Sequence, residues 1–179
     1  MLAAPLTGTF DGNTLSRHMV HSILETLREH YECTVVDTGY ANLESTLAAM
    51  DYSDLIVVVL GMDLPRLRDG KQYLKNLVAA NYAKDKIRVV VNRSTGSKEI
   101  SSAEVESILE FPVAAQIPND DALVNSSINL GQPFVSSSAH KPVAKSVIAL
   151  AASLMPQSGG AAIAATKRRA GTKWFSFVH

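Results

Sequence analysis

An aspartate followed by a short turn is the first feature of this sequence that could do chemistry. Thr34, Val35 and Val36 lead directly into Asp37, and Thr38 and Gly39 follow. Because β-branched residues favour strands and glycine permits a sharp turn, the pattern predicts a buried strand that delivers Asp37 to a turn. A carboxylate in that position suits magnesium, which takes oxygen ligands and few carboxylates from the protein.

The loop that usually cradles phosphates does not accompany this aspartate. The pattern G-x-x-x-x-G-K-[ST], whose main-chain amides and lysine hold phosphate groups, occurs nowhere in the 179 residues. The sequence therefore has the features of the downstream half of a nucleotide-binding domain without its phosphate cradle.

Composition narrows the class of protein. Apolar residues make up 46% of the chain and charged residues 19%, as in a globular domain. The 17 basic residues equal the 17 acidic ones, so no overall field favours nucleic acid, and we predict no specific nucleic-acid partner. Cys33 is the only cysteine; it suits a small core residue and a reducing, cytoplasmic setting. No apolar run approaches the roughly 20 residues that span a bilayer.

Apolar runs and helical periodicities alternate along the chain. We expect strands at 33–37, 55–60, 87–91 and 112–117, and helices at 14–31, 43–50, 66–81, 101–110, 120–130 and 141–154. This alternation predicts an α/β fold, with a parallel sheet and helices on both faces. In the first helix, Ile23, Leu24 and Leu27 form the stripe that we expect to dock on the sheet.

The same alternation sets the domain organisation and the place of a ligand. We expect one domain over residues 1–155 and a flexible tail over 156–179, where glycine, alanine and serine dominate before a basic and aromatic end. Ligands of parallel sheets bind beyond the carboxyl ends of the strands. The segments 37–39, 61–63, 92–93 and 118–120 should all lie at that edge.

A series of short motifs occurs in a recognisable order. It consists of Asp-x-Gly at 37–39, Tyr-Ser-Asp at 52–54, Asp-Leu-Pro-Arg-Leu-Arg at 63–68, Val-Asn-Arg at 91–93, Gln-Ile-Pro-Asn-Asp at 116–120 and Asn-x-Gly-Gln-Pro at 129–133. In this order and at these intervals, the motifs over about residues 20–155 resemble those of the MinD/ParA-type ATPases with a deviant P-loop. Within that family, the sequence is most similar to the CpaE and TadZ proteins of Tad (Flp) pilus assembly.

The resemblance implies a P-loop NTPase fold and roles near the phosphates. Asp37 would be the catalytic carboxylate and would hold magnesium through a water molecule. Thr38 and Gly39 would sense the γ-phosphate through their main-chain amides. Asn129 and Gly131 belong to a turn and helix end that the family keeps near the nucleotide. ATP and Mg²⁺ are therefore the implied cofactors.

The resemblance also implies a base-binding end. Asn92 would read the edge of the adenine, and Arg93 would flank the base. Ile117 and Pro118 would contact the base through their main chain.

The chain departs from the family before residue 14. Family members open with a strand and a K-G-G-x-G-K-[ST] loop, and that strand lies beside the Asp37 strand at the centre of the sheet. Three explanations fit its absence: the sheet closes up, another polypeptide completes it, or the sequence is an N-terminally truncated form. In each case we expect no ATP hydrolysis by the chain alone, because the phosphate cradle is missing.

Two functions follow from the resemblance. The first is an ATPase-family protein that localises or assembles pilus machinery, acting as a homodimer in the cytoplasm or peripherally at the inner membrane or cell pole. The second is a non-enzymatic scaffold or partner-binding module derived from the same fold. The basic and aromatic segment 167–177 is either a disordered tail or a contact with a membrane or a partner protein.

Overall fold

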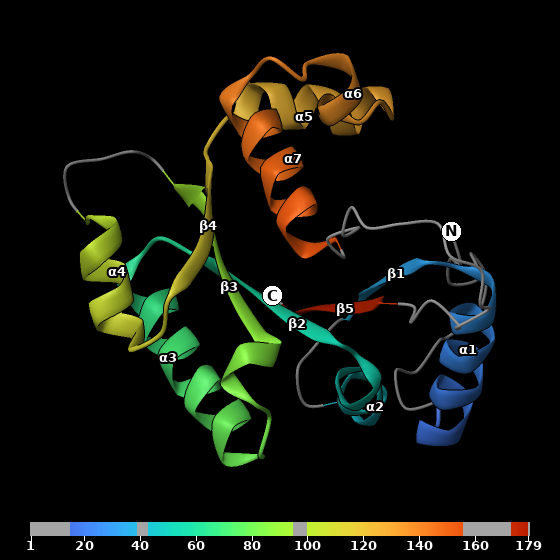
Figure 1. The fold of residues 1–179 in the computed structure, drawn as a ribbon. Coiled ribbons are helices and arrows are strands. Elements are labelled where there is room, and N and C mark those ends of the chain that lie inside the picture. Colours follow the sequence, from blue (N-terminus) through green and yellow to red (C-terminus); the bar gives the residue numbers. More distant parts are fainter. Residues whose placement is uncertain (1–14, 39–42, 95–99, 156–172, 179) are drawn as a thin grey trace, which may run out of the picture.

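The computed structural model describes residues 15–38, 43–94 and 100–155, together with the main chain of residues 173–178. Its elements alternate as the sequence pattern predicts (Figure 1). In chain order they are α1 (Arg17–His30), β1 (Cys33–Asp37), α2 (Glu44–Tyr52), β2 (Leu55–Gly61), α3 (Leu64–Ala79), the short 3₁₀ helix η2 (Lys84–Lys86), β3 (Ile87–Ser94), α4 (Ser102–Leu109), β4 (Val113–Pro118), α5 (Asp121–Leu130), α6 (Phe134–Ser137), α7 (Pro142–Leu154) and β5 (Lys173–Val178).

The described strands form one five-stranded sheet in the order β1-β5-β2-β3-β4. Every adjacent pair is parallel. Parallel neighbours need long crossover connections, and helices supply most of them here. The four strands expected from the apolar runs are all present, which confirms the predicted α/β fold with a parallel sheet. The short helix α6 was not predicted.

Helices cover both faces of the sheet (Figure 1). On one face, α2, α3 and α4 pack over alternate strand residues such as Ile56 and Val58. Val57, which lies between these two residues, packs on the opposite face against α7. This alternation follows from the two-residue period of a strand, and it explains why β2 is apolar along its whole length.

Local sequence signals fix where several helices begin and end. Ser101 and Glu104 form the capping box that their spacing predicts. Asp63 caps α3, and Pro65 lies in the first turn of that helix, where its missing N–H costs nothing. Gly131 ends α5 with a φ of 62°, a left-handed conformation that glycine adopts without strain.

Helix α1 docks on α2 more than on the sheet. Val20 and Leu24 pack against Ala48 and Ala49 of α2, and Leu27 lies at the margin of this cluster. Ile23 is 42% exposed. The expectation that Ile23 helps dock the first helix on the sheet is therefore wrong, because the helix turns its buried stripe toward its neighbouring helix.

The C-terminal strand is the main correction to the sequence analysis. Residues 156–179 were expected to be a flexible tail, but Lys173–Val178 form β5 between β1 and β2. Residues 156–172 and 179 lie outside the described part. A sheet without β5 would leave both β1 and β2 with unpaired edges. The aromatic and β-branched residues of this segment suit a strand, although it is far in sequence from its partners.

We predict that Leu24→Ala lowers the free energy of unfolding by about 2–5 kcal/mol, because the side chain is buried between α1 and α2 and its loss leaves a cavity. Ile23→Ala is the matched control on the same helix and should change the stability by less than about 0.5 kcal/mol. Urea unfolding followed by circular dichroism measures both. Equal effects of the two substitutions would contradict the described docking of α1.

We also predict that Lys173→Cys forms a disulfide with Cys33 within one chain under mild oxidation. The two residues are register partners on adjacent parallel strands; strands lie about 4.8 Å apart, within the Cα separation that disulfides accept. Ser176→Cys is the control, because it lies about three residues further along β5, too far from Cys33. Thiol titration and peptide masses report the bond. Two free thiols after oxidation of Lys173→Cys would show that β5 does not occupy this position.

Candidate functional site

The carboxyl ends of the parallel strands meet at one edge of the sheet. Asp37 ends β1, Gly61 ends β2, and Pro118 ends β4. Asn92 lies near the end of β3, directly beside Gly61 in the register of the two strands. The sequence analysis placed a ligand at this edge, and the residues expected there occupy it as far as they are described.

Asn92 and Arg93 lie near the end of β3, where the register of β3 with β4 shifts between Val91 and Ser94. Both residues are exposed. Arg93 has a φ of 56°, a left-handed conformation that is uncommon for residues other than glycine. Its main-chain N–H donates to Oδ1 of Asn92 over 2.8 Å, which compensates part of the conformational cost. This bond uses one acceptor of the Asn92 amide, and the Nδ2 group carries two donors suited to a ligand.

The side chain of Arg93 reaches the start of α5. Its Nη2 lies 3.3 Å from Oδ1 of Asp121, and both side chains are more than half exposed. Water screens such a pair, so it orients the guanidinium more than it stabilises the fold. Asp121 was not singled out by sequence reasoning, because nothing in its position in the sequence links it to Arg93.

The end of β4 pairs with the end of β3 directly after Asn92 and Arg93. Pro118 is the register partner of Ser94. The N–H of Asn119 donates to the Ser94 carbonyl over 2.9 Å, and its Nδ2 donates to Asp121 Oδ2 over 3.0 Å. Ile117 is buried beneath α7, so only its main chain can contribute to a ligand contact, as the resemblance implied. Pro118 is half-buried.

A second arginine lies over the end of β2. A methyl group added to Gly61 would come within 2.6 Å of Cδ of Arg66. The Arg66 guanidinium also pairs with Asp63 over 3.3 Å, while Asp63 Oδ1 accepts from the Arg66 N–H over 3.0 Å and so caps α3. The sequence reasoning included these residues in a motif but gave Arg66 no role. The sequence signal that could have indicated this contact is the glycine at position 61, three residues before α3, because it leaves room for a long side chain from the helix.

Asp37 and Thr38 lie apart from this group. Asp37 is exposed at the end of β1, Thr38 is buried, and Gly39 lies outside the described residues. Because β5 separates β1 from β2, the ends of β1 and β2 are two strand spacings apart, or about 10 Å. The structure thus gathers Asn92, Arg93, Ile117 and Pro118 on neighbouring strands and places Asp37 and Thr38 across β5.

The described residues fit the base of a nucleotide better than its phosphates. An amide, a guanidinium and a strand end at β3 and β4 supply the donors, acceptors and flat contacts that a purine uses. The phosphates would need main-chain amides and a lysine in a loop, and the sequence has no such pattern. Within the described residues, no three His, Cys, Asp or Glu side chains gather in a way that could hold a metal ion. Asp37 alone would depend on phosphate oxygens to complete a magnesium site.

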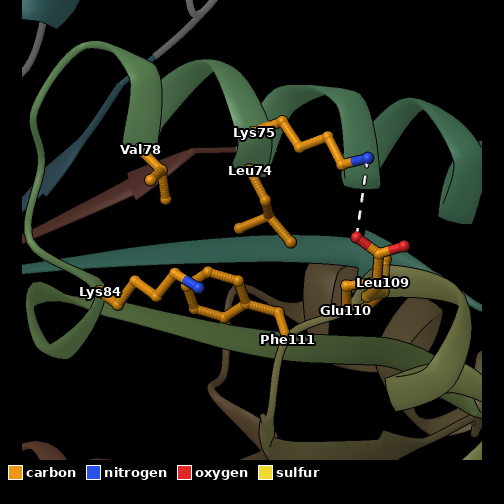
Figure 2. A pocket seen from close by; sticks show the side chains of 7 residues that line it. All are labelled: Leu74, Lys75, Val78, Lys84, Leu109, Glu110 and Phe111. Carbon is orange, nitrogen blue, oxygen red and sulfur yellow. Dashed lines mark ion pairs between the residues drawn. The ribbon is translucent and has the colours of Figure 1, made fainter.

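A pocket of about 220 Å³ lies at the opposite edge of the sheet, where the strands begin (Figure 2). Lys84 precedes β3, and Phe111 precedes β4. A hydrogen bond from Lys71 and the charges of Lys71 and Lys75 hold the pKa of Glu110 below its usual value. None of the expected site residues lines this pocket. Its lining consists of Leu74, Lys75, Val78, Lys84, Leu109, Glu110 and Phe111.

Comparison with known proteins gives a relative that spans more than this chain. No family model matches the sequence. An uncharacterized ATP-binding protein of Methanocaldococcus jannaschii is 26% identical over 137 residues, which cover 76% of this chain and 51% of that protein. The chain therefore spans about half the length of this curated relative.

Three solved structures share the fold. A ParA family ATPase from Chlorobium tepidum matches with a TM-score of 0.70 and 21% identity, over 77% of this chain and 57% of that one. The septum site-determining protein MinD of Pyrococcus horikoshii, solved with Mg-ADP, matches with a TM-score of 0.62 and 20% identity, over 80% of this chain and 58% of that one. The cell division ATPase MinD of Pyrococcus furiosus matches with a TM-score of 0.58 and 22% identity, over 76% of this chain and 57% of that one. Over about three quarters of its length, this chain has the fold of the ParA and MinD ATPases.

Proposed function

We propose that this chain binds an adenine nucleotide at the carboxyl edge of its sheet, as a protein of the ParA and MinD ATPase type. The observation that carries the proposal is the group formed by Asn92, Arg93 and the end of β4, held together by the contacts of Asn119 with Ser94 and Asp121. The fold shared with ATPases, one of them solved with Mg-ADP, supports it, as does the ATP-binding relative.

In this proposal, the base lies against the ends of β3 and β4. The Asn92 amide reads the edge of the adenine, and Arg93 covers one side of it while Asp121 orients the guanidinium. The phosphates point along the edge toward Gly61, where Arg66 offers a positive charge, and toward Asp37 across β5. Asp37 would hold magnesium through water, Thr38 and Gly39 would sense the γ-phosphate, and the main chain of Ile117 and Pro118 would contact the base.

The proposed cellular role is the localisation or assembly of pilus machinery, as in the CpaE and TadZ proteins that the motif series resembles. The protein would act in the cytoplasm or peripherally at the inner membrane or cell pole, with pilus proteins as partners. Among the described residues, no helix has the length and apolar character needed to cross a membrane. A membrane or partner contact of the basic and aromatic segment 167–177 would fall to its residues 167–172, since Lys173–Val178 lie inside the sheet.

A scaffold function without turnover is the second candidate. The specific observation in its favour is that the positive side chains at the edge are already paired: Arg93 with Asp121 and Arg66 with Asp63. An edge closed by its own ion pairs can keep a partner surface without a nucleotide. Nucleotide binding by the purified chain separates the two functions.

We predict that Asn92→Ala weakens the binding of a fluorescent ATP analogue by about 10-fold, which corresponds to the loss of one net hydrogen bond of about 1–1.5 kcal/mol. Asn125→Ala, an exposed change on α5, is the matched control and should bind like the unmodified chain. Fluorescence titration measures the dissociation constants. Unchanged affinity of Asn92→Ala would place the base elsewhere, and no binding by the unmodified chain would favour the scaffold.

We predict that the chain alone does not release phosphate from ATP. Phosphoryl transfer depends on positioning and charge neutralisation by a loop, a lysine and magnesium, and loss of even one aligned donor typically costs about 100-fold or more in rate. A coupled phosphate assay with Mg²⁺ measures the rate. Steady magnesium-dependent release that Asp37→Ala abolishes would show that the chain is an ATPase by itself.

A further inference from the structure

Strands β1 and β2 form the two walls of a slot that one extended strand fills. β5 pairs in parallel with Cys33–Asp37 of β1 on one side and with Leu55–Val58 of β2 on the other. Both ladders join main-chain groups, so they require an extended parallel strand at the right register but do not require that it come from the same chain.

The two walls are joined to each other without β5. Helix α2 packs against α1 through Ala48 and Ala49, and its Met50 lies in the core beside Ile56 of β2. Lys86, the last residue of η2 before β3, donates to the Met50 carbonyl over 2.8 Å. Helix α2 therefore links the two sides of the slot by packing that does not involve the main-chain ladders of β5.

β5 can leave the slot without passing through any other described element. It follows every other described element in the chain, and residues 156–172 join it to α7. A segment of that length reaches up to about 60 Å when extended, which is enough to carry β5 to a neighbouring molecule. The chain has no net charge at pH 7, so two copies do not repel each other strongly.

We propose that this slot is a strand-acceptor site that two copies of the chain can fill reciprocally, each donating residues 173–178 to the other. The exchanged dimer keeps the same ladders as two closed monomers, so exchange is a low-cost route to a dimer. Closure within one chain has an effective concentration in the millimolar range. The dimer therefore forms when the chain refolds at high concentration and persists because both ladders must break to release it.

Two full-length variants test the exchange. The first is the unmodified chain, which carries Cys33 alone. The second variant combines Cys33→Ser with Lys173→Cys. Its thiol at position 173 stands opposite a serine in its own chain and therefore has no thiol partner there. After the two are refolded together at high concentration and mildly oxidised, we expect a disulfide-linked species near twice the 19.2 kDa of one chain. Peptide masses should identify the bond between Cys33 and position 173.

A second pairing controls for chance collisions of thiols. The unmodified chain is refolded with Cys33→Ser carrying Ser176→Cys, which stands opposite Val36 rather than Cys33; it should give only traces of the mixed disulfide. The Lys173→Cys variant that keeps Cys33 is the positive control: its disulfide within one chain shows that the oxidation is effective and that β5 lies beside β1. If that variant closes within one chain while the test mixture gives no more mixed disulfide than the control, the exchange is refuted. If the single-chain variant does not close, the slot itself is refuted.

Discussion

The main-chain pairing of β5 between β1 and β2 is the constraint on which the rest of the architecture depends. Without it, the sheet would consist of β2, β3 and β4 on one side and an isolated β1 on the other, attached only through helix packing. Buried main-chain groups must find partners, and a single inserted strand satisfies two edges at once. The same strand sets the distance between Asp37 and the group around Asn92, so the geometry of the candidate site follows from it.

That distance divides the candidate site into two halves of different character. The half at β3 and β4 is cross-linked by hydrogen bonds and an ion pair among Ser94, Asn119, Asp121 and Arg93. The half at β1 consists of an exposed carboxylate followed by a buried threonine. A ligand that bridges both halves would have to be long, with a flat end that accepts amide contacts and a charged end. A nucleotide has this shape, which is why we propose this class of ligand for the edge.

Patterns confined to one segment were predictable from the sequence. The apolar run of β2 required burial on both faces, and the Ser101–Glu104 box and Gly131 set helix ends by local chemistry. Contacts between distant segments were not predictable. Arg93 meets Asp121 only because α5 begins beside the end of β3, and Arg66 lies over Gly61 because α3 begins there. β5 was missed for the same reason: strand pairing at long range leaves no periodic signal in a short, basic and glycine-flanked segment.

The position of β5 also affects how the molecule is made. A ribosome releases the chain from its N-terminal end, so the strand at the middle of the sheet emerges after every other described element. Until then, β1 and β2 expose facing edges, and such edges are sites of mispairing and aggregation. The contacts that complete the sheet join residues far apart in sequence, which slows folding. Nascent chains of this protein therefore pass through a long interval in which protection by a chaperone has the greatest effect on the yield of folded molecules.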